Sequence, residues 1–200
     1  MKAILMSIRP KWVAKILNGE KTIEIRKKFP KDYVGWVYIY CTKENSNFLH
    51  NNCIDIWWVE DRDFQKKNKR LGLEQQSILN GKVVAIFWCD KVEEIVYDYG
   101  GVYEMFQTNK LDCDNLNAKS CLTDNELKQY LKPKREHGNI CGKAIHITNL
   151  EIFDKPKELS KFKHTIKKHY YNADFDYGGV EEITLPLTRA PQSWCYVEVE

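Results

Sequence analysis

The chain has 200 residues, with 31 lysines and arginines against 28 aspartates and glutamates, and 43% of its residues are hydrophobic. This length suits one domain, or two small ones, and the apolar share excludes disorder as a description of the whole chain. The net charge of +3 excludes a histone-like polycation. It does not exclude a nucleic-acid partner, because local clustering of charge decides such binding.

Seven cysteines are spread along the chain without a CxxC pair. Structural zinc sites usually carry ligands in closely spaced pairs, and disulfide frameworks favour an even number of cysteines in a secreted chain. The apolar start at Ala3–Ile8 is too short for a signal peptide, and no run approaches 18 apolar residues. We therefore expect a reduced, cytoplasmic, monomeric protein with no metal, no cofactor and no membrane partner.

The first thirty residues predict a strand, a helix and a second strand. Residues 3–6 are apolar on both parities, as in a strand buried on both faces. Pro10 suits the first position of a helix, whose apolar stripe comprises Trp12, Val13, Ile16 and Leu17. Asn18-Gly19 ends that helix, and residues 22–26 then alternate with the period of a strand.

Further strands are predicted at residues 36–41, 81–89, 144–153 and 193–199, and the apolar segment 81–89 is expected to be central. Thr123 with Glu126 predicts a helix start by its capping-box spacing. The lysine-rich segment 155–171 is predicted to be helical. Strands outnumber helices and do not form regular βαβ units, which favours an α+β fold with a mixed, largely antiparallel, barrel-like sheet and peripheral helices.

A short charged motif follows the first helix. Residues 19–26 read G-x-K-x-x-E-x-R, with Lys21, Glu24 and Arg26 as the charged positions. Glu24 and Arg26 share one face of the predicted strand, so either side chain can orient the other. An ion pair on a solvated strand face is the simplest interpretation, and it contributes only about 0–1 kcal/mol.

This motif, placed directly after the helix that ends in Leu17-Asn18-Gly19, resembles the ASCH domains of the PUA-like superfold. Three further segments are similar to the longer, phage-encoded members of that family: 7–10 (SIRP), 154–159 (DKPKEL) and 186–194 (PLTRAPQSW). The resemblance implies one domain over residues 1–200, with a small β-barrel scaffold. The segments 43–80, 98–139 and 155–182 are then expected to be insertions.

The resemblance also implies a cleft beside the motif that binds RNA or a modified nucleoside or nucleotide. Glu24 would accept hydrogen bonds from the amino edge of a base, and Lys21 and Arg26 would meet phosphate or a base carbonyl. Residues expected to neighbour this cleft are Ser7, Arg9, Lys43 and Trp194.

A hydrolase is the first alternative. Some small ASCH-like proteins are amidohydrolases that deacetylate N4-acetylcytidine, and the resemblance implies a motif lysine with a threonine nucleophile three residues later. This chain keeps Lys21, but Glu24 stands at the nucleophile position. Other relatives resemble metal-assisted ribonucleases, for which His164 with His169, or Cys141 with His146, would be sparse ligands. If the protein is an enzyme, Lys21 and Glu24 are its catalytic candidates.

Other features carry two interpretations each. Lys161, Lys163, Lys167 and Lys168 are candidate phosphate contacts, although a solvated helix face explains them as well. The aromatic stripe of Trp36, Tyr38 and Tyr40 suits either base stacking or a core. His146 suits a structural role better than that of a general base. The third functional alternative is a phage-type protein-interaction or inhibitor module that binds a host protein through the insertions, with Ile56-Trp57-Trp58 as its anchor.

Overall fold

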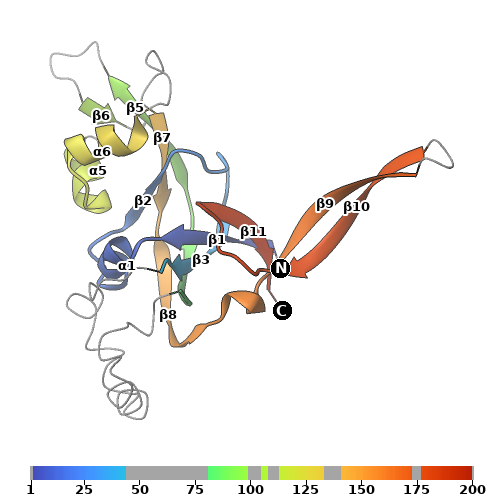
Figure 1. The fold of residues 1–200 in the computed structure, drawn as a ribbon. Coiled ribbons are helices and arrows are strands. Elements are labelled where there is room, and N and C mark those ends of the chain that lie inside the picture. Colours follow the sequence, from blue (N-terminus) through green and yellow to red (C-terminus); the bar gives the residue numbers. More distant parts are fainter. Residues whose placement is uncertain are drawn as a thin grey trace.

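The computed structural model describes residues 2–43, 81–98, 105–107, 113–132, 141–172 and 177–199. Most of the predicted insertion at 43–80, with Ile56-Trp57-Trp58, lies outside these residues. Within them, strands predominate and helices are few, so the fold is α+β as predicted. Figure 1 shows the sheets, the helices at their margin and a long two-stranded ribbon.

The larger sheet has seven strands in the order β10-β9-β11-β1-β3-β4-β8. Strands β1 and β3 pair in parallel, and the other neighbours in this sheet pair antiparallel, so the predicted mixed sheet is confirmed. The apolar strand β4 lies between β3 and β8, inside the sheet as expected. The bounds are β1 Lys2–Ile8, β3 Gly35–Cys41, β4 Val83–Cys89, β8 Thr148–Lys157, β9 Lys163–Asn172, β10 Tyr177–Pro186 and β11 Trp194–Glu198.

The smaller sheet has four antiparallel strands in the order β2-β7-β5-β6. Their bounds are β2 Ile23–Arg26, β7 Cys141–His146, β5 Val92–Asp98 and β6 Met105–Gln107. Among the described strands the two sheets stay open, so the predicted barrel is wrong as to closure. The chain passes between them over short connections, two residues from β4 to β5 and one from β7 to β8.

The strand predicted at 144–153 is therefore two strands in different sheets. Its alternation of apolar and polar residues continues through the change of sheet, so the sequence pattern does not mark the break. The backbone marks it: His146 N donates to the Lys91 carbonyl and Ile147 N donates to the Thr22 carbonyl, both across the smaller sheet. Beyond Ile147, Thr148 pairs with Trp88 of β4 in the larger sheet.

Four helical segments occur among the described residues, at the margins of the sheets. The helix α1 (Pro10–Leu17) begins with Pro10 and ends at Asn18, before Gly19 with φ +76°, as the sequence predicts. The helices α5 (Cys113–Ser120) and α6 (Asp124–Leu131) lie together, and Thr123 caps α6 with the predicted capping box. The 3₁₀ helix η1 (Leu159–Lys161) precedes the ribbon.

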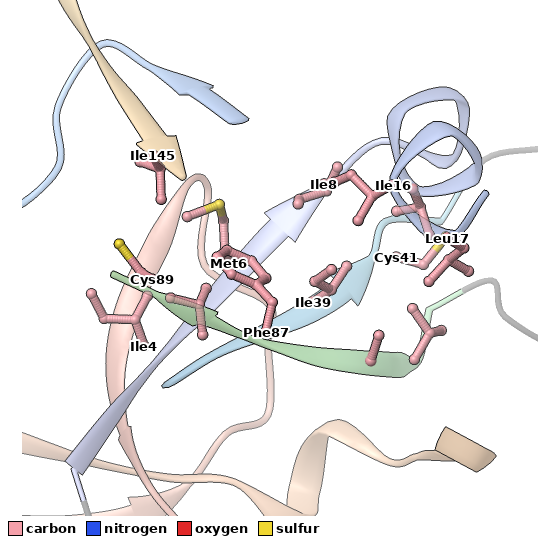
Figure 2. Close-up of a cluster of buried hydrophobic side chains, with 14 of the residues drawn as sticks. Ile4, Met6, Ile8, Ile16, Leu17, Ile39, Cys41, Phe87, Cys89 and Ile145 are labelled. Atoms are coloured by element: carbon pink, nitrogen blue, oxygen red, sulfur yellow. The ribbon is translucent and has the colours of Figure 1, made fainter. Parts of the chain in front are cut away.

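The main core fills the space between α1 and the larger sheet. Figure 2 shows Ile4, Met6 and Ile8 of β1, Ile39 of β3 and Phe87 of β4 gathered with side chains of α1, and all of these are buried. A second cluster lies under α5 and α6, and a third lies on the far face of the larger sheet. Tyr40 belongs to this third cluster, and Trp36 and Tyr38 pack against it. The aromatic stripe therefore forms part of the core, which was one of its two interpretations.

The lysine-rich segment 155–171 comprises the end of β8, the short 3₁₀ helix η1 and most of β9, so the prediction of a helix over this segment is wrong. Lysine is compatible with a helix, but Thr165 and Ile166 are β-branched and Tyr170 is aromatic, and such residues favour strands. The segment finds its partner in β10, whose Val180 and Ile183 are also strand formers. The helix prediction was based on the lysines and did not consider that this segment could pair with residues 177–186.

Candidate functional site

The turn between α1 and β2 brings the motif residues together. Lys21 N donates to the Lys15 carbonyl and Thr22 N donates to the Lys119 carbonyl, which fixes the turn against α1 and α5. Glu24 and Arg26 then extend from the same face of β2, as the strand period requires. Strand β2 pairs with β7, with Glu24 opposite Ile145.

Lys21, Glu24 and Arg26 form one charged cluster, which we call the KER cluster. Lys21 Nζ lies 3.4 Å from Glu24 Oε2, and Arg26 Nη2 lies 3.0 Å from Glu24 Oε1. The residues are buried, with exposed fractions of 2%, 5% and 8% in chain order. Each cation also donates to a backbone carbonyl, Lys21 Nζ to Ser120 at 2.6 Å and Arg26 Nη2 to Ser7 at 2.7 Å.

This cluster is electrostatically unusual for a structural feature. Burial lowers the pKa of Lys21 below its usual value, and the nearby Glu24 carboxylate opposes that shift. Taking such charges out of water costs several kcal/mol per ion, so buried ion pairs contribute little net stability. Arg26 Nε is also buried, and it has no hydrogen-bond partner among the described residues. Unpaired buried donors of this kind call for an explanation, which a ligand would provide.

Two predicted neighbours, Ser7 and Trp194, already have structural partners. The Ser7 hydroxyl donates to the Pro191 carbonyl at 2.6 Å, and its own carbonyl accepts from Arg26. Trp194 Nε1 donates to the Lys28 carbonyl at 2.8 Å, and its ring packs edge-on to Phe29. Ser7 therefore holds Arg26 in place, while Trp194 ties β11 to the segment after β2.

The other two, Arg9 and Lys43, are exposed. Arg9 is the N-cap residue of α1, and its positive charge acts on the Tyr130 hydroxyl of α6. Lys43 comes just after β3, whose Cys41 pairs with Ile8 at the end of β1. Its side chain lies across Gly81, where an added Cβ would come within 2.8 Å of Lys43 Cε. Arg9 thus acts by its charge on Tyr130, whereas Lys43 lies against Gly81.

Two aromatic residues beside the cluster were not predicted as site residues. Lys21 Nζ lies 5.2 Å from the centre of the half-buried Trp12 ring. At the other end, Tyr130 is 41% exposed, and the charges of Arg26 and Glu24 both act on its hydroxyl. Burial of the hydroxyl raises the pKa of Tyr130, and the charges of Arg26 and Arg9 oppose this shift. The sequence marks Trp12 only as part of an apolar stripe, and Tyr130 lies about a hundred residues from the motif.

Helices α1 and α6 approach each other on this side of the cluster. Lys11 Nζ lies 3.9 Å from Glu126 Oε1, and it also lies 4.6 Å from the Trp12 ring centre. Lys27 Nζ lies 6.0 Å from the Tyr130 ring centre. Lys11 and Lys27 thus place positive charge beside the two rings, and Lys11 is paired with Glu126.

The four candidate phosphate contacts lie elsewhere. Lys161 belongs to η1 at the base of the ribbon, and Lys163, Lys167 and Lys168 belong to β9. Lys167 forms an exposed ion pair with Glu182 of β10 at 3.4 Å, and Lys168 stands opposite Glu181 in the strand register. The acidic strand therefore compensates much of the charge that the sequence suggested for nucleic-acid contact.

His146 lies on the other face of the smaller sheet. Its Nε2 comes within 3.2 Å of Oε1 of the buried Glu93, which also pairs with Lys91. Burial lowers the pKa of His146, and the charge of Lys91 adds to this shift. The arrangement agrees with the structural role favoured for His146, and Glu93 is its unpredicted partner.

No cluster of three His, Cys, Asp or Glu side chains suited to a metal ion occurs in the described part of the chain. Among the same residues, none of the helices is long and apolar enough to cross a membrane.

Comparison with known proteins gave structural neighbours only. No family model matches the sequence, and no curated protein matches it. Solved structures that resemble this chain include ASCH-domain proteins. The structure of ASCH from Zymomonas mobilis has 13% identity and a TM-score of 0.44, and the match covers 78% of this chain and 73% of that one. A single-substitution mutant of that protein has 12% identity and a TM-score of 0.43, with coverage of 80% and 77%.

These neighbours carry the family name that the sequence resemblance suggested. A likeness of this degree supports no inference about activity or about individual site residues. The case for a function therefore depends on the residues of this chain.

Proposed function

We propose that the KER cluster, with Trp12 and Tyr130, binds a nucleobase of RNA or of a modified nucleoside or nucleotide. The observation that carries this proposal is a buried trio of charges with an aromatic ring at each end and a guanidinium N–H that has no partner within the part of the chain that the structure describes. Strongly perturbed titratable groups cluster at functional sites, and the desolvation cost of a buried charge is offset where the charge serves binding.

The chemistry of each group suits a base. A carboxylate accepts hydrogen bonds from an exocyclic amino group, and a guanidinium donates to a carbonyl or ring nitrogen. Aromatic rings provide stacking surfaces that tolerate any base, each worth roughly 1–3 kcal/mol. Arg9, Lys11 and Lys27 add positive charge around the rings, which suits a ligand that carries phosphate.

Fluorescence anisotropy with short, labelled single-stranded RNA tests the proposal. We expect binding that weakens as salt rises, because phosphate contacts release counterions. Tyr130→Ala removes one stacking surface and should raise the Kd roughly 5- to 150-fold. Tyr196→Ala is the matched control, because Tyr196 is a comparably exposed tyrosine (40%) whose ring packs on Tyr33 and Trp194.

A second variant probes the charged part of the site without removing a buried ion. Arg26→Lys keeps the positive charge but loses the planar fork and its Nε–H. Binding should weaken in this variant while its circular dichroism stays that of the parent. Absence of RNA or nucleoside binding at low salt, or equal affinities for the parent, Tyr130→Ala and Arg26→Lys, would refute the proposal.

A hydrolase is the second candidate, and the lowered pKa of Lys21 is the observation that favours it. A lysine depressed by burial can act as a general base near neutral pH. The recorded contacts of Lys21 Nζ are the Ser120 carbonyl, the Glu24 carboxylate and the Trp12 ring, none of which is a hydroxyl nucleophile. Incubation with N4-acetylcytidine or labelled RNA, with and without divalent metal, decides between the two, since turnover lost in Lys21→Met would favour catalysis.

A further inference from the structure

The β9–β10 ribbon extends away from the rest of the fold. Figure 1 shows it starting beside both chain termini and reaching well beyond the sheets. Its two strands pair antiparallel over ten residue pairs, from Lys163 opposite Pro186 to Asn172 opposite Tyr177. Its recorded pairing with the body is at the base, where Lys163 meets Glu198 of β11.

One face of the ribbon continues the third core cluster. Phe162 and Leu187 are buried in that cluster, and Leu187 N donates a hydrogen bond to the Phe162 carbonyl. Moving outward in steps of two residues keeps to the same face and reaches Leu185, Ile166 with Ile183, and then Tyr170. We call Ile166, Tyr170, Ile183 and Leu185 the apolar stripe. Leu185, Ile166 and Tyr170 are 43%, 38% and 44% exposed, so this face is partly open to solvent beyond Phe162 and Leu187.

Such a ribbon gains by being covered. A two-stranded hairpin alone is marginally stable in water, and stability normally requires a third strand or a packed face. Burying the stripe would supply that packing, because transfer of apolar surface from water is favourable. Exposed apolar residues gathered on one face in this way often mark an interface, and here the Lys168 and Glu181 pair lies among them.

The charges on the ribbon favour protein over nucleic acid as the partner. Its described strands carry three lysines, all on β9, and two glutamates, both on β10. Lys167 and Glu182 already form an ion pair on the face opposite the stripe. Lys168 and Glu181 stand across from each other on the stripe's own face. The net charge of the ribbon is therefore close to zero, but β9 is positively charged and β10 is negatively charged.

We propose that the apolar stripe is a self-association surface, and that its occupant is the same stripe of a second copy of this chain. A two-fold axis running along the ribbon lays β9 of one copy on β10 of the other. Ile166 then meets the partner's Ile183, and Lys168 meets the partner's Glu181. A two-fold axis across the strands would instead lay β9 on β9 and gather the lysines of both copies. Charge complementarity therefore selects the first arrangement.

The size of the surface sets the strength expected. Ten residues at about 3.4 Å each make the ribbon about 34 Å long, and two strands about 5 Å apart make it about 10 Å wide. One face therefore presents roughly 340 Å² per copy, or about 700 Å² for two copies. This is below the roughly 1,200–2,000 Å² of stable complexes, so the dimer should be weak and reversible. We expect a monomer near 1 μM and a growing dimer fraction toward several hundred μM, by an order-of-magnitude estimate.

Sedimentation analysis of the full chain over this concentration range tests the surface. Ile166→Asp places a charge in the stripe and should keep the protein monomeric throughout. Val180→Asp is the matched control, because Val180 is 52% exposed but lies on the opposite face of the same ribbon. Circular dichroism confirms that both variants fold, and Leu185→Asp gives an independent test of the stripe should Ile166→Asp disturb the hairpin.

A mixing experiment isolates contacts between copies from those within one copy. Lys168→Glu and Glu181→Lys should each weaken self-association, because like charges then meet across the interface. Mixing these two variants should restore association as a heterodimer. The control mixture is Lys167→Glu with Glu182→Lys, which makes the same charge changes on the other face and should form no extra heterodimer.

Four results would overturn the proposal. The first is a protein that stays monomeric at every concentration. The second is a dimer that Ile166→Asp and Leu185→Asp leave unchanged, and the third is equal heterodimer formation in the two mixtures. The fourth is labelled RNA that binds the parent protein and does not bind the Lys168→Glu variant, since the surface would then serve nucleic acid and not self-association.

Discussion

Replacing Glu24 by glutamine tests the energetics of the KER cluster. The carboxylate lies between two buried cations, 3.4 Å from Lys21 Nζ and 3.0 Å from Arg26 Nη2. Glutamine is similar in size and still accepts hydrogen bonds, but it carries no charge. Both cations would then be buried without a counter-charge.

The magnitude follows from that geometry. Breaking a buried ion pair by removing one partner costs about 3–5 kcal/mol, and we take the lower end because glutamine keeps an acceptor. A loss of about 3 kcal/mol lowers the Tm of a domain of this size by roughly 6–12 °C. Urea unfolding, with the midpoint and slope both fitted, measures the free energy change directly.

The control is Glu94→Gln. Glu94 is also a strand glutamate paired with a lysine, Lys143, but it is half exposed. Its replacement should leave the urea midpoint almost unchanged, because exposed ion pairs contribute little to stability. If Glu24→Gln and Glu94→Gln destabilise the protein equally, the carboxylate does not neutralise two buried cations, and the description of the cluster is wrong.

Three further predictions concern other parts of the chain. Burial lowers the pKa of His146 below 6.5, so the imidazole is protonated at a higher pH in the unfolded chain than in the folded chain. The free energy of unfolding should therefore fall as pH drops below about 6.5. His146→Gln should make the free energy of unfolding less dependent on pH in this range. Thr123→Ala removes a capping box and should cost about 1 kcal/mol in urea unfolding; an unchanged midpoint would contradict the cap. The exposed Cys141 should be alkylated rapidly by iodoacetamide, whereas Cys89, with its pKa raised to about 12 by burial, should react only after unfolding. Peptide mass spectrometry reads both thiols, and equal rates would contradict the burial of Cys89.

The local features of the first thirty residues could be predicted from sequence because neighbouring residues determine them. Pro10 and Gly19 mark the two ends of α1, and the alternation after Gly19 marks β2. The same holds for the capping box at Thr123. Each of these signals depends on residues within one turn or a few strand positions of one another.

Features set by distant contacts were missed. The open sheets, the break at Ile147 and the ribbon depend on which strands pair, and periodicity along one segment does not report its partner. The burial of the KER cluster also escaped prediction, since charged strand residues usually face solvent. Lys21 is buried because Trp12 and the Ser120 carbonyl enclose its ammonium group. Tyr130 reaches the cluster only through the packing of α6.

The indole N–H signals in a ¹H–¹⁵N spectrum provide the most direct test of the proposed binding site. The chain has six tryptophans, and Trp12→Phe and Trp194→Phe assign the two that matter. Titration with nucleotides and short single-stranded RNA should shift the Trp12 signal. The Trp194 signal, whose N–H is held by the Lys28 carbonyl, should stay in place. Saturable binding that leaves Trp12 unmoved, or no binding at all, would contradict a nucleobase site at the KER cluster.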